Sequence, residues 1–227
     1  MENNFKIRCS SLGKIMTSPK SKGEVLSQTA KTYLKELALE EKFGIRKEFS
    51  SRYTDKGNIQ EDTAIEMGSK VLNLPFALKN TDYFENEFIK GTPDLILEDE
   101  IIDIKCSWDG TTFPWFEDEL PNKDYFWQLV GYCWLTGRSK ARIVYCLVDT
   151  PEDIVQDEIR RTSWKKFEID VTEETENEVR AKHEFSHISE NKRVRAYLIE
   201  LTEEDIDKVK EKLSHAREYY NDLIDRL

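Results

Sequence analysis

One stretch of this chain, residues 91–107, combines polar and apolar residues in an order that few folds can accommodate. It reads GTPDLILEDEIIDIKCS: a Pro-Asp pair, a short apolar run, an acidic turn and a second apolar run. The second run contains Asp103 and Lys105. Because side chains alternate between the two faces of a strand, we expect Asp103 and Lys105 to share one face while Ile102 and Ile104 occupy the other.

A hairpin would bring a second carboxylate to the same place. If residues 94–97 and 101–105 pair as strands, Asp94 lies at the rim of the face that holds Asp103 and Lys105. Two acids and an amine then converge, with apolar packing behind them. This arrangement suits a divalent cation with oxygen ligands, next to a lysine that steadies a nucleophilic water.

An ordinary ion pair on a solvated strand face is the alternative interpretation. Acid-x-Lys triplets are common in a chain with 35% charged residues, and two others occur, at Glu40–Lys42 and Glu190–Lys192. The first lies in a helical pattern and the second in a polar stretch. Only the central triplet lies in an apolar strand pattern just after a Pro-Asp pair, and on these residues alone both interpretations stay open.

Two further features favour a functional site. Glu61, in a helical pattern upstream, offers a third carboxylate for an oxygen shell around Mg²⁺, although a lone helical glutamate is more often a surface residue. Gln128 and Tyr132 lie four residues apart in an apolar helical pattern, so their side chains are neighbours. A buried amide and phenol need hydrogen-bond partners, and either a site or the core can supply them.

A group that could hold a phosphate lies near the start of the chain. Arg8, Ser10 and Ser11 offer a guanidinium, hydroxyls and backbone amides, which together can bind a phosphate. The net charge of −11 argues against a sequence-independent binder of polyanions. Basic residues nevertheless cluster in three places: residues 14–22, 160–166 and 192–195.

Hydrophobic periodicity predicts an α/β protein. Helical spacing predicts helices at residues 24–43, 55–72, 123–136 and 203–227, the last of them amphipathic. Strands are expected at residues 83–89, 94–97, 101–105, 141–148 and 164–170. Helices, a central hairpin, another helix, a strand and more helix indicate layers of helix on sheet. A chain of 227 residues is expected to form a single domain over residues 1–227.

Composition excludes several classes of protein. No apolar run approaches the length of a membrane span, and the first residues lack a signal-peptide core, so a cytoplasmic protein is expected. The four cysteines stand singly, which argues against a disulfide framework or a zinc ribbon. We expect buried free thiols instead.

Taken together, these motifs resemble the PD-(D/E)XK nuclease superfamily, and within it the phage lambda exonuclease and YqaJ-type, RecB-like branch. The resemblance rests on four motifs in order, which are Gly57-x-x-x-Glu61-x-x-Ala64, Gly91-Thr92-Pro93-Asp94, Asp103-Ile104-Lys105 and Gln128-x-x-x-Tyr132. It covers roughly residues 8–150. Asp103 stands where the closer relatives usually have Glu. No cysteine follows Cys146, so the variant of the family with an iron–sulfur cluster is not expected.

The resemblance implies a restriction-endonuclease-like core, a central mixed β-sheet flanked by helices, over about residues 8–170. A helical part would follow over about residues 171–227. It also implies a Mg²⁺-dependent deoxyribonuclease, with Mn²⁺ able to substitute. Asp94, Asp103, the Ile104 carbonyl and Glu61 would hold the metal, and Lys105 would orient the attacking water.

The remaining implications concern support of the site and partners. Gln128 and Tyr132 would support the site from their helix, and Arg8, with Ser10 and Ser11, would bind a 5′ phosphate. Relatives degrade one strand of linear duplex DNA from its 5′ end in phage recombination, and some form rings of three subunits. Double-stranded DNA ends, further copies of the chain and a single-strand annealing protein are therefore the expected partners, in the cytoplasm of a bacterial host and with no membrane.

A rival motif lies at residues 183–187. They read HEFSH, which matches H-E-x-x-H, and on a helix His183 and His187 would bind Zn²⁺ with Glu184 as the general base of a metalloprotease. The longer metzincin pattern fails, because Glu190 and Arg193 stand where Gly and His are required. Two exposed histidines on a charged helix are the simpler interpretation. A DNA-binding or assembly protein that keeps the fold without catalysis is the third alternative.

Overall fold

A four-stranded mixed sheet forms the centre of the protein. The structure is a computed structural model that describes residues 5–47, 51–74 and 78–227. The sheet contains β4 (Leu95–Ile96), β5 (Glu100–Cys106), β6 (Lys140–Cys146) and β7 (Val194–Glu200), in that spatial order. The β5 and β6 strands are parallel and the other two pairs are antiparallel. Parallel neighbours need a crossover, which is α4 (Lys123–Thr136).

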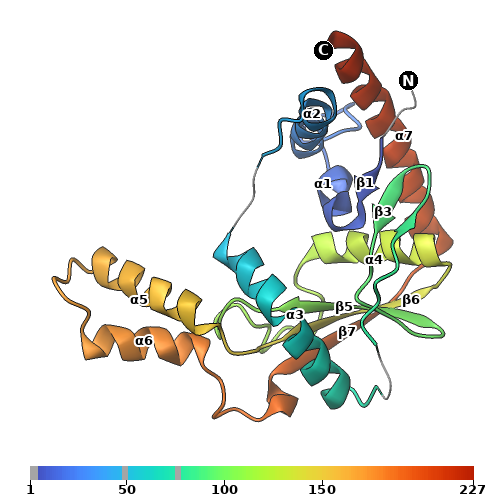
Figure 1. The fold of residues 1–227 in the computed structure, drawn as a ribbon. Helices are drawn as coiled ribbons and strands as arrows, with labels where there is room; N and C mark the ends of the chain where they lie inside the picture. Colours follow the sequence, from blue (N-terminus) through green and yellow to red (C-terminus); the bar gives the residue numbers. More distant parts are fainter. Residues whose placement is uncertain (1–4, 48–50, 75–77) are drawn as a thin grey trace.

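The two faces of this sheet belong to different apolar clusters. Ile101 and Ile143 pack on the side of α4, whereas Ile102 and Ile104 pack on the side of α3 (Arg52–Val71). Figure 1 shows α4 on one side of the sheet and α3 on the other. The alternation expected for residues 101–105 is therefore confirmed, and it places Asp103 on the α4 side.

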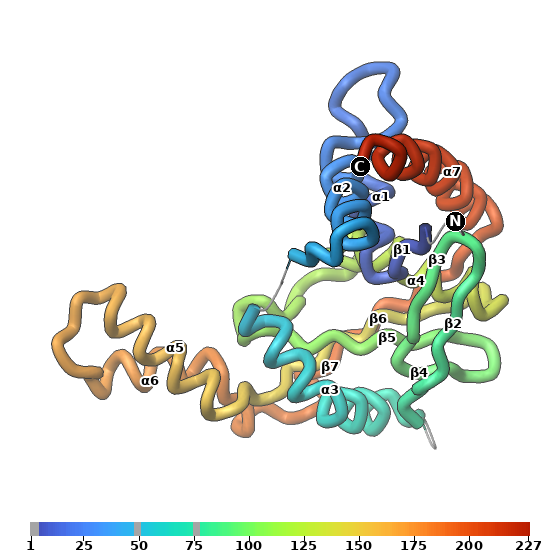
Figure 2. Tube along the Cα trace, turned by 45° about the horizontal axis from the view of Figure 1, so that its top comes forward, coloured from blue at the N-terminus to red at the C-terminus, as the bar shows by residue number. Residues whose placement is uncertain are grey.

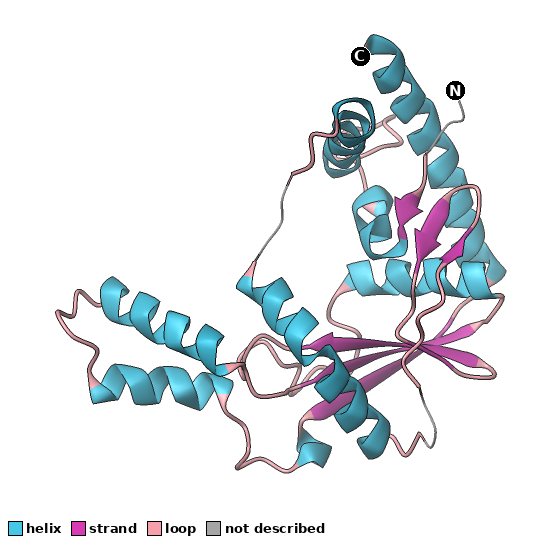
Figure 3. Cartoon of the chain, viewed as in Figure 1, coloured by secondary structure: helices cyan, strands magenta, loops and turns pink. Residues whose placement is uncertain are grey.

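A second, smaller sheet stands beside the first (Figure 3). It contains β1 (Ile7–Arg8), β3 (Ile89–Gly91) and β2 (Phe84–Glu85), with β1 parallel to β3. The single strand expected over residues 83–89 is thus two short strands. The Asn86 side chain accepts hydrogen bonds from the amides of Phe88 and Ile89. These bonds fix the turn that joins β2 to β3.

Helices complete the half of the molecule that carries the small sheet. They are η1 (Cys9–Ser11), α1 (Leu12–Met16), α2 (Gln28–Phe43) and α7 (Glu203–Arg226). The expected helix at residues 24–43 begins later, because the Ser27 hydroxyl caps α2 by accepting from the amide of Ala30. Gly44 and Gly137 end α2 and α4 in the left-handed conformation.

A pair of antiparallel helices projects away from the sheets. These helices, α5 (Glu152–Lys165) and α6 (Glu173–His183), extend from the body in Figures 1 and 2. The strand expected over residues 164–170 is wrong. Trp164 lies in the last turn of α5, and Phe167 takes a positive φ of 58° in the turn that follows, which an extended strand does not allow.

After α5 and α6 the chain returns to the sheet. After η2 (Glu190–Lys192) it forms β7, a strand that the sequence analysis missed, and then α7. The expected α/β class, with mixed sheets, flanking helices and a C-terminal helix, is confirmed. None of the described helices combines the length and the apolar character that crossing a membrane requires.

Candidate nuclease active site

The hairpin of β4 and β5 brings Asp94, Asp103 and Lys105 together. Asp103 and Lys105 are two residues apart on β5, and an Oδ2 to Nζ distance of 2.5 Å joins them. Asp94 precedes β4, and its Oδ2 accepts a 2.6 Å hydrogen bond from the amide of Ile104. The backbone amide of Ile104 on β5 thus holds the Asp94 carboxylate in place. Asp103 and Lys105 are the residues on either side of Ile104.

Burial makes this pair of acids electrostatically strained. Asp103 is only 1% exposed. Burial, and then the Asp103 carboxylate, raise the pKa of Asp94 from its ordinary value to about 7. Burial alone would lower the pKa of Lys105, but the Asp103 and Asp94 carboxylates outweigh it and raise that pKa above its usual value. Lys105 is therefore an ammonium at neutral pH, so it acts as a charge and a hydrogen-bond donor.

The α4 helix supports the acids from one side. Gln128 Nε2 donates to Asp103 Oδ1 and to the hydroxyl of Tyr132, at 3.0 Å in both cases. Both side chains are buried, at 5% exposure. The buried amide thus has its partners in the Asp103 carboxylate and the Tyr132 hydroxyl, and the phenol has its partner in Gln128. Burial, and then the Asp103 carboxylate, raise the pKa of Tyr132, so the phenol stays neutral.

Glu61 lies near these acids but turns to a different partner. It is on α3, and its carboxylate raises the pKa of Asp94 as a minor contribution. Its Oε2 lies 3.1 Å from Nζ of Lys79. Across residues 5–47, 51–74 and 78–227, no three His, Cys, Asp or Glu side chains lie close enough together to hold a metal ion. The structure therefore brings Asp94 and Asp103 together and leaves Glu61 paired with a lysine.

The residues of the hairpin fit a Mg²⁺ ion. Oδ2 of Asp103 is buried and forms no hydrogen bond of good geometry with the described residues, and its close neighbour is the Lys105 ammonium. Mg²⁺ typically takes one or two carboxylates and completes its shell with waters and substrate phosphate oxygens. Asp94, Asp103 and the Ile104 carbonyl match this requirement. The two carboxylates are buried close together, so their negative charges repel each other. A bound cation would offset this repulsion, which favours an occupied site.

Arg8 lies at a cavity that is linked to Asp103 through Tyr132 and Gln128. The cavity has a volume of about 370 Å³, and its lining includes Arg8, Ser10, Lys90 and Tyr132. Tyr132 is the residue that accepts from Gln128, so the cavity wall and the Asp103 carboxylate share one hydrogen-bonded chain. The main chain comes close here, because a methyl group added at Gly91 would lie 2.7 Å from the Tyr132 ring.

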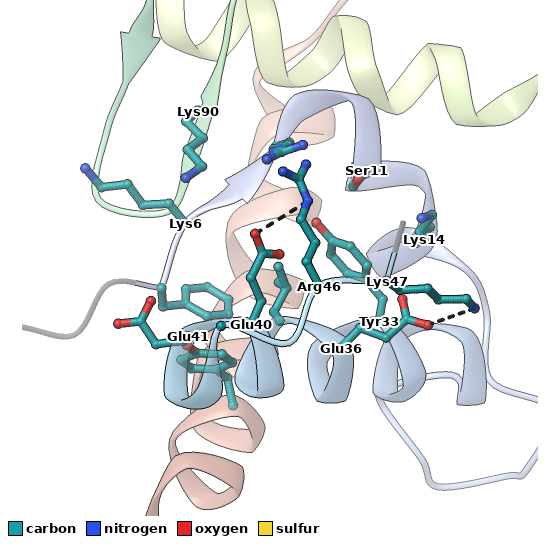
Figure 4. Close-up of a pocket in the computed structure, with 15 residues that line it drawn as sticks. Lys6, Ser11, Lys14, Tyr33, Glu36, Glu40, Glu41, Arg46, Lys47 and Lys90 are labelled. Carbon is teal, nitrogen blue, oxygen red and sulfur yellow. Dashed lines mark hydrogen bonds and ion pairs between the residues drawn. The ribbon is translucent and has the colours of Figure 1, made fainter. Parts of the chain in front are cut away.

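Arg8 also lines a larger cavity, of about 870 Å³ (Figure 4). Ser11 and Tyr33 line it, with basic side chains from four separate segments: Lys6, Arg8, Lys14, Arg46, Lys47 and Lys90. Three glutamates also line it, and two of them pair with Arg46 and Lys47. The local excess of positive charge contrasts with the acidic chain as a whole, and a phosphate backbone responds to the local field.

The HEFSH segment does not form the helix that a zinc site needs. His183 is the last residue of α6, and Glu184 is extended, with φ −119° and ψ 122°. His183 is buried and its Nδ1 hydrogen-bonds to Thr150, whereas His187 is exposed. The zinc metalloprotease is therefore wrong, and so is the simpler expectation of two exposed histidines on a helix. The Glu-rich helix ends early because the chain turns to bury Phe185.

Comparison with solved structures settles the family. The chain matches the crystal structure of a phage related exonuclease from Haemophilus somnus 129PT, with 34% identity and a TM-score of 0.79 over 98% of this chain and 96% of that one. The chain belongs to the lambda exonuclease-like, YqaJ-type branch of the PD-(D/E)XK nucleases. No protein-family model matches the chain, and no curated protein matches it significantly.

More distant nucleases share the fold of this lambda exonuclease-like chain. The alkaline exonuclease LHK-Exo from Laribacter hongkongensis matches with 14% identity and a TM-score of 0.67, over 97% of this chain and 90% of that one. The same protein in complex with dAMP matches with 15% identity and a TM-score of 0.66 over the same shares. At this identity the likeness concerns the fold alone.

Sequence reasoning about this exonuclease-like chain missed several residues around the acids. The Tyr125 ring lies 4.7 Å from Nζ of Lys105, and it is three residues before Gln128 on the same helical face. The three-residue spacing between Tyr125 and Gln128 could therefore have predicted that Tyr125 faces the acids. No sequence pattern pointed to the basic residues Lys90, Arg46 and Lys47, because they line the basic cavity from segments that are far apart in the sequence.

Proposed function

We propose that the protein is a Mg²⁺-dependent exonuclease that degrades one strand of linear double-stranded DNA from its 5′ end, with Mn²⁺ able to replace Mg²⁺. The observation that carries this proposal is the meeting of Asp94 and Asp103 beside Lys105, next to a cavity that Arg8 lines. Two solved structures of similar fold are described as exonucleases, and one of them is a complex with dAMP. Both facts support a DNA substrate.

Each residue of the hairpin has a distinct task in this proposal. Asp94, Asp103 and the Ile104 carbonyl would hold the cation, and Glu61 would join them on releasing Lys79. The bound ion supplies Lewis acidity toward the scissile phosphate and makes a water easier to ionise. Lys105, held as an ammonium, orients that water and offsets negative charge that develops on the phosphate.

The phosphate group at the DNA end would lie on the opposite wall. Arg8 can donate two parallel hydrogen bonds to phosphate oxygens, and the hydroxyls of Ser10 and Ser11 can add others. The larger basic cavity that Arg8 also lines (Figure 4) offers a path for the duplex. The product strand is single-stranded, so we expect a single-strand annealing protein to act on it next.

The activity test compares linear with circular duplex DNA, each with Mg²⁺, Mn²⁺ or EDTA. We expect loss of the linear form alone, and only with a divalent cation. Release of a label from the 5′ end before one from the 3′ end supports the polarity. Binding without cleavage even in the presence of Mg²⁺ or Mn²⁺ would establish the non-catalytic alternative and end the proposal.

A matched pair of variants on one hairpin tests the site. Asp103→Asn should lower the rate by about a thousandfold or more while the circular dichroism spectrum stays unchanged, because the cation loses a charged ligand. Asp99→Asn changes an exposed acid in the turn of the same hairpin and should keep full activity. A fully active Asp103→Asn protein would refute the assignment.

A further inference from the structure

Lys56 is a lysine that the fold buries completely. It lies on α3 and is 0% exposed, and its Nζ donates a 2.9 Å hydrogen bond to the carbonyl oxygen of Trp108. Across the described ranges 5–47, 51–74 and 78–227, no carboxylate forms an ion pair with it. A lysine normally buries only its stem and keeps its ammonium in water. A buried ammonium without a paired carboxylate therefore costs folding free energy.

The surroundings of Lys56 do not offset this cost. The centroid of the Phe185 ring lies 5.7 Å from Nζ. Titratable groups from four segments face the ammonium, and they are Cys106, Asp109, Asp149 and His183. Burial lowers the pKa of Lys56 to about 8, although the thiol and the two aspartates act in the opposite direction. The protein thus keeps a charged lysine here at neutral pH, at a cost in stability.

Packing alone does not explain a lysine at this position. Methionine is also long and unbranched, fits irregular apolar space and brings no charge to bury. Replacing a buried charge by an apolar residue of similar volume is often neutral or stabilising. A residue that lowers stability where another would fit is typical of positions at which function sets the choice.

The hydrogen bond of Lys56 joins the start of α3 to the end of β5. Trp108 lies two residues beyond the end of that strand. A second contact is close by, because Cys106 Sγ donates to the Gly57 carbonyl oxygen of α3 at 4.0 Å. Glu61 follows on α3, between one and two helical turns after Lys56. The two contacts therefore set where α3 lies along β5, and with it the distance from Glu61 to the acids of the hairpin.

We propose that Lys56 is a positioning residue for the metal site. Its hydrogen bond to Trp108 holds α3 where Glu61 can reach the cation that the two aspartates would bind. Because Glu61 pairs with Lys79 in this structure, a helix held in place leaves only the side chain to turn toward the cation. This role rests on the proposed function, and it concerns a side chain that itself touches neither the cation nor the DNA.

The first experiment measures thermal unfolding in EDTA. At pH 7 Lys56→Met should melt at a higher temperature than the wild type, because losing the donor to Trp108 costs less than burying an ammonium. The folded protein releases the Lys56 proton near pH 8 and the unfolded chain near pH 10.5, so wild-type stability rises across that interval and the difference should disappear at its upper end. Lys70→Met, at an exposed position of the same helix, should match the wild type throughout. A Lys56→Met protein that melts lower than the wild type at pH 7 would overturn the proposal.

The second experiment measures Mg²⁺ binding by calorimetry at pH 7. Lys56→Met should bind Mg²⁺ about tenfold to a hundredfold more weakly than the wild type, and Lys70→Met should bind it equally well. In a Glu61→Gln background, Lys56→Met should add little further loss, because it acts through Glu61. A loss that adds in full to that of Glu61→Gln would show that Lys56 acts by another route and would overturn the proposal.

Cleavage of linear duplex DNA by the same proteins separates this role from the proposed function. A wild type that binds Mg²⁺ and cleaves DNA, with a Lys56→Met protein that does both equally well, would refute the role of Lys56 alone. A wild type that neither binds Mg²⁺ nor cleaves DNA would end the proposed function, and the role of Lys56 with it.

Discussion

The side-chain amide of Gln128 donates a 3.0 Å hydrogen bond to Oδ1 of Asp103, across the space between α4 and β5. This bond holds one carboxylate oxygen and leaves Oδ2 beside Lys105. In the proposed site, a residue that touches the Asp103 carboxylate in this way would orient a metal ligand without binding the metal itself. Its removal should therefore change how tightly the cation binds more than it changes the chemical step.

Gln128→Leu should raise the Mg²⁺ concentration for half-maximal activity by about tenfold to a hundredfold, the usual cost of losing such support. Activity at saturating Mg²⁺ should stay close to that of the wild type. A titration of initial rate against Mg²⁺ measures both quantities. Gln156→Leu, at a half-buried position on α5, is the control. An equal loss at every Mg²⁺ concentration would mean that Gln128 has another role.

Lys105→Met should separate catalysis from metal binding. We expect the rate to fall by about a hundredfold or more, because the ammonium no longer steadies the water and the phosphate charge. Mg²⁺ should bind at least as tightly at pH 8, because a positive charge has left the neighbourhood of two acids. Calorimetry of Mg²⁺ binding and single-turnover kinetics give the two values. Weaker Mg²⁺ binding would place Lys105 among the groups that build the metal site.

The metal-free protein should lose stability as the pH rises from about 4 to about 7. The folded state holds the Asp94 proton up to a pKa of about 7, whereas the unfolded chain releases it near 3.8, so the folded state binds more protons in that interval. Asp94→Asn lacks this titration and should unfold at higher temperature than the wild type at pH 8, but not at pH 4. Thermal unfolding in EDTA measures the difference.

Mg²⁺ provides the second half of that test. Adding it at pH 8 should raise the melting temperature of the wild type and leave Asp94→Asn unchanged, because the cation binds the ionised carboxylate. Asp99→Asn, on the same hairpin, should behave as the wild type in both experiments. A wild type whose metal-free stability is flat from pH 4 to 7 would contradict the shifted pKa.

Two glycines should respond to alanine in opposite directions. At Gly131 a methyl group would lie 2.5 Å from Leu12 Cδ1 and 2.9 Å from Cys9 Sγ, so these two buried side chains must shift to make room for it. We expect Gly131→Ala to lower the free energy of unfolding by about 1–3 kcal/mol. Gly57, within α3, has no atom near such a methyl, so Gly57→Ala should raise it by roughly 0.5–1 kcal/mol. Urea denaturation distinguishes the two.

Local patterns were sufficient where the evidence lay within one element. The alternation in residues 101–105 placed Asp103 and Lys105 on one face, and the four-residue spacing placed Gln128 beside Tyr132. Local patterns failed where long-range contacts decide. The apolar residues of 164–170 alternate loosely, but no neighbouring strand is there to pair with them, and the chain turns at Phe167 instead.

The sequence by itself determined the hairpin and its polar face, because strand alternation depends only on residues near one another in the chain. Only the tertiary structure decided that α4 lies over Asp103, that Glu61 pairs with Lys79 and that His183 is buried away from His187. Those outcomes depend on which surfaces of distant segments pack together. Such packing is set by the sum of many weak contacts, and no short stretch of sequence contains that sum.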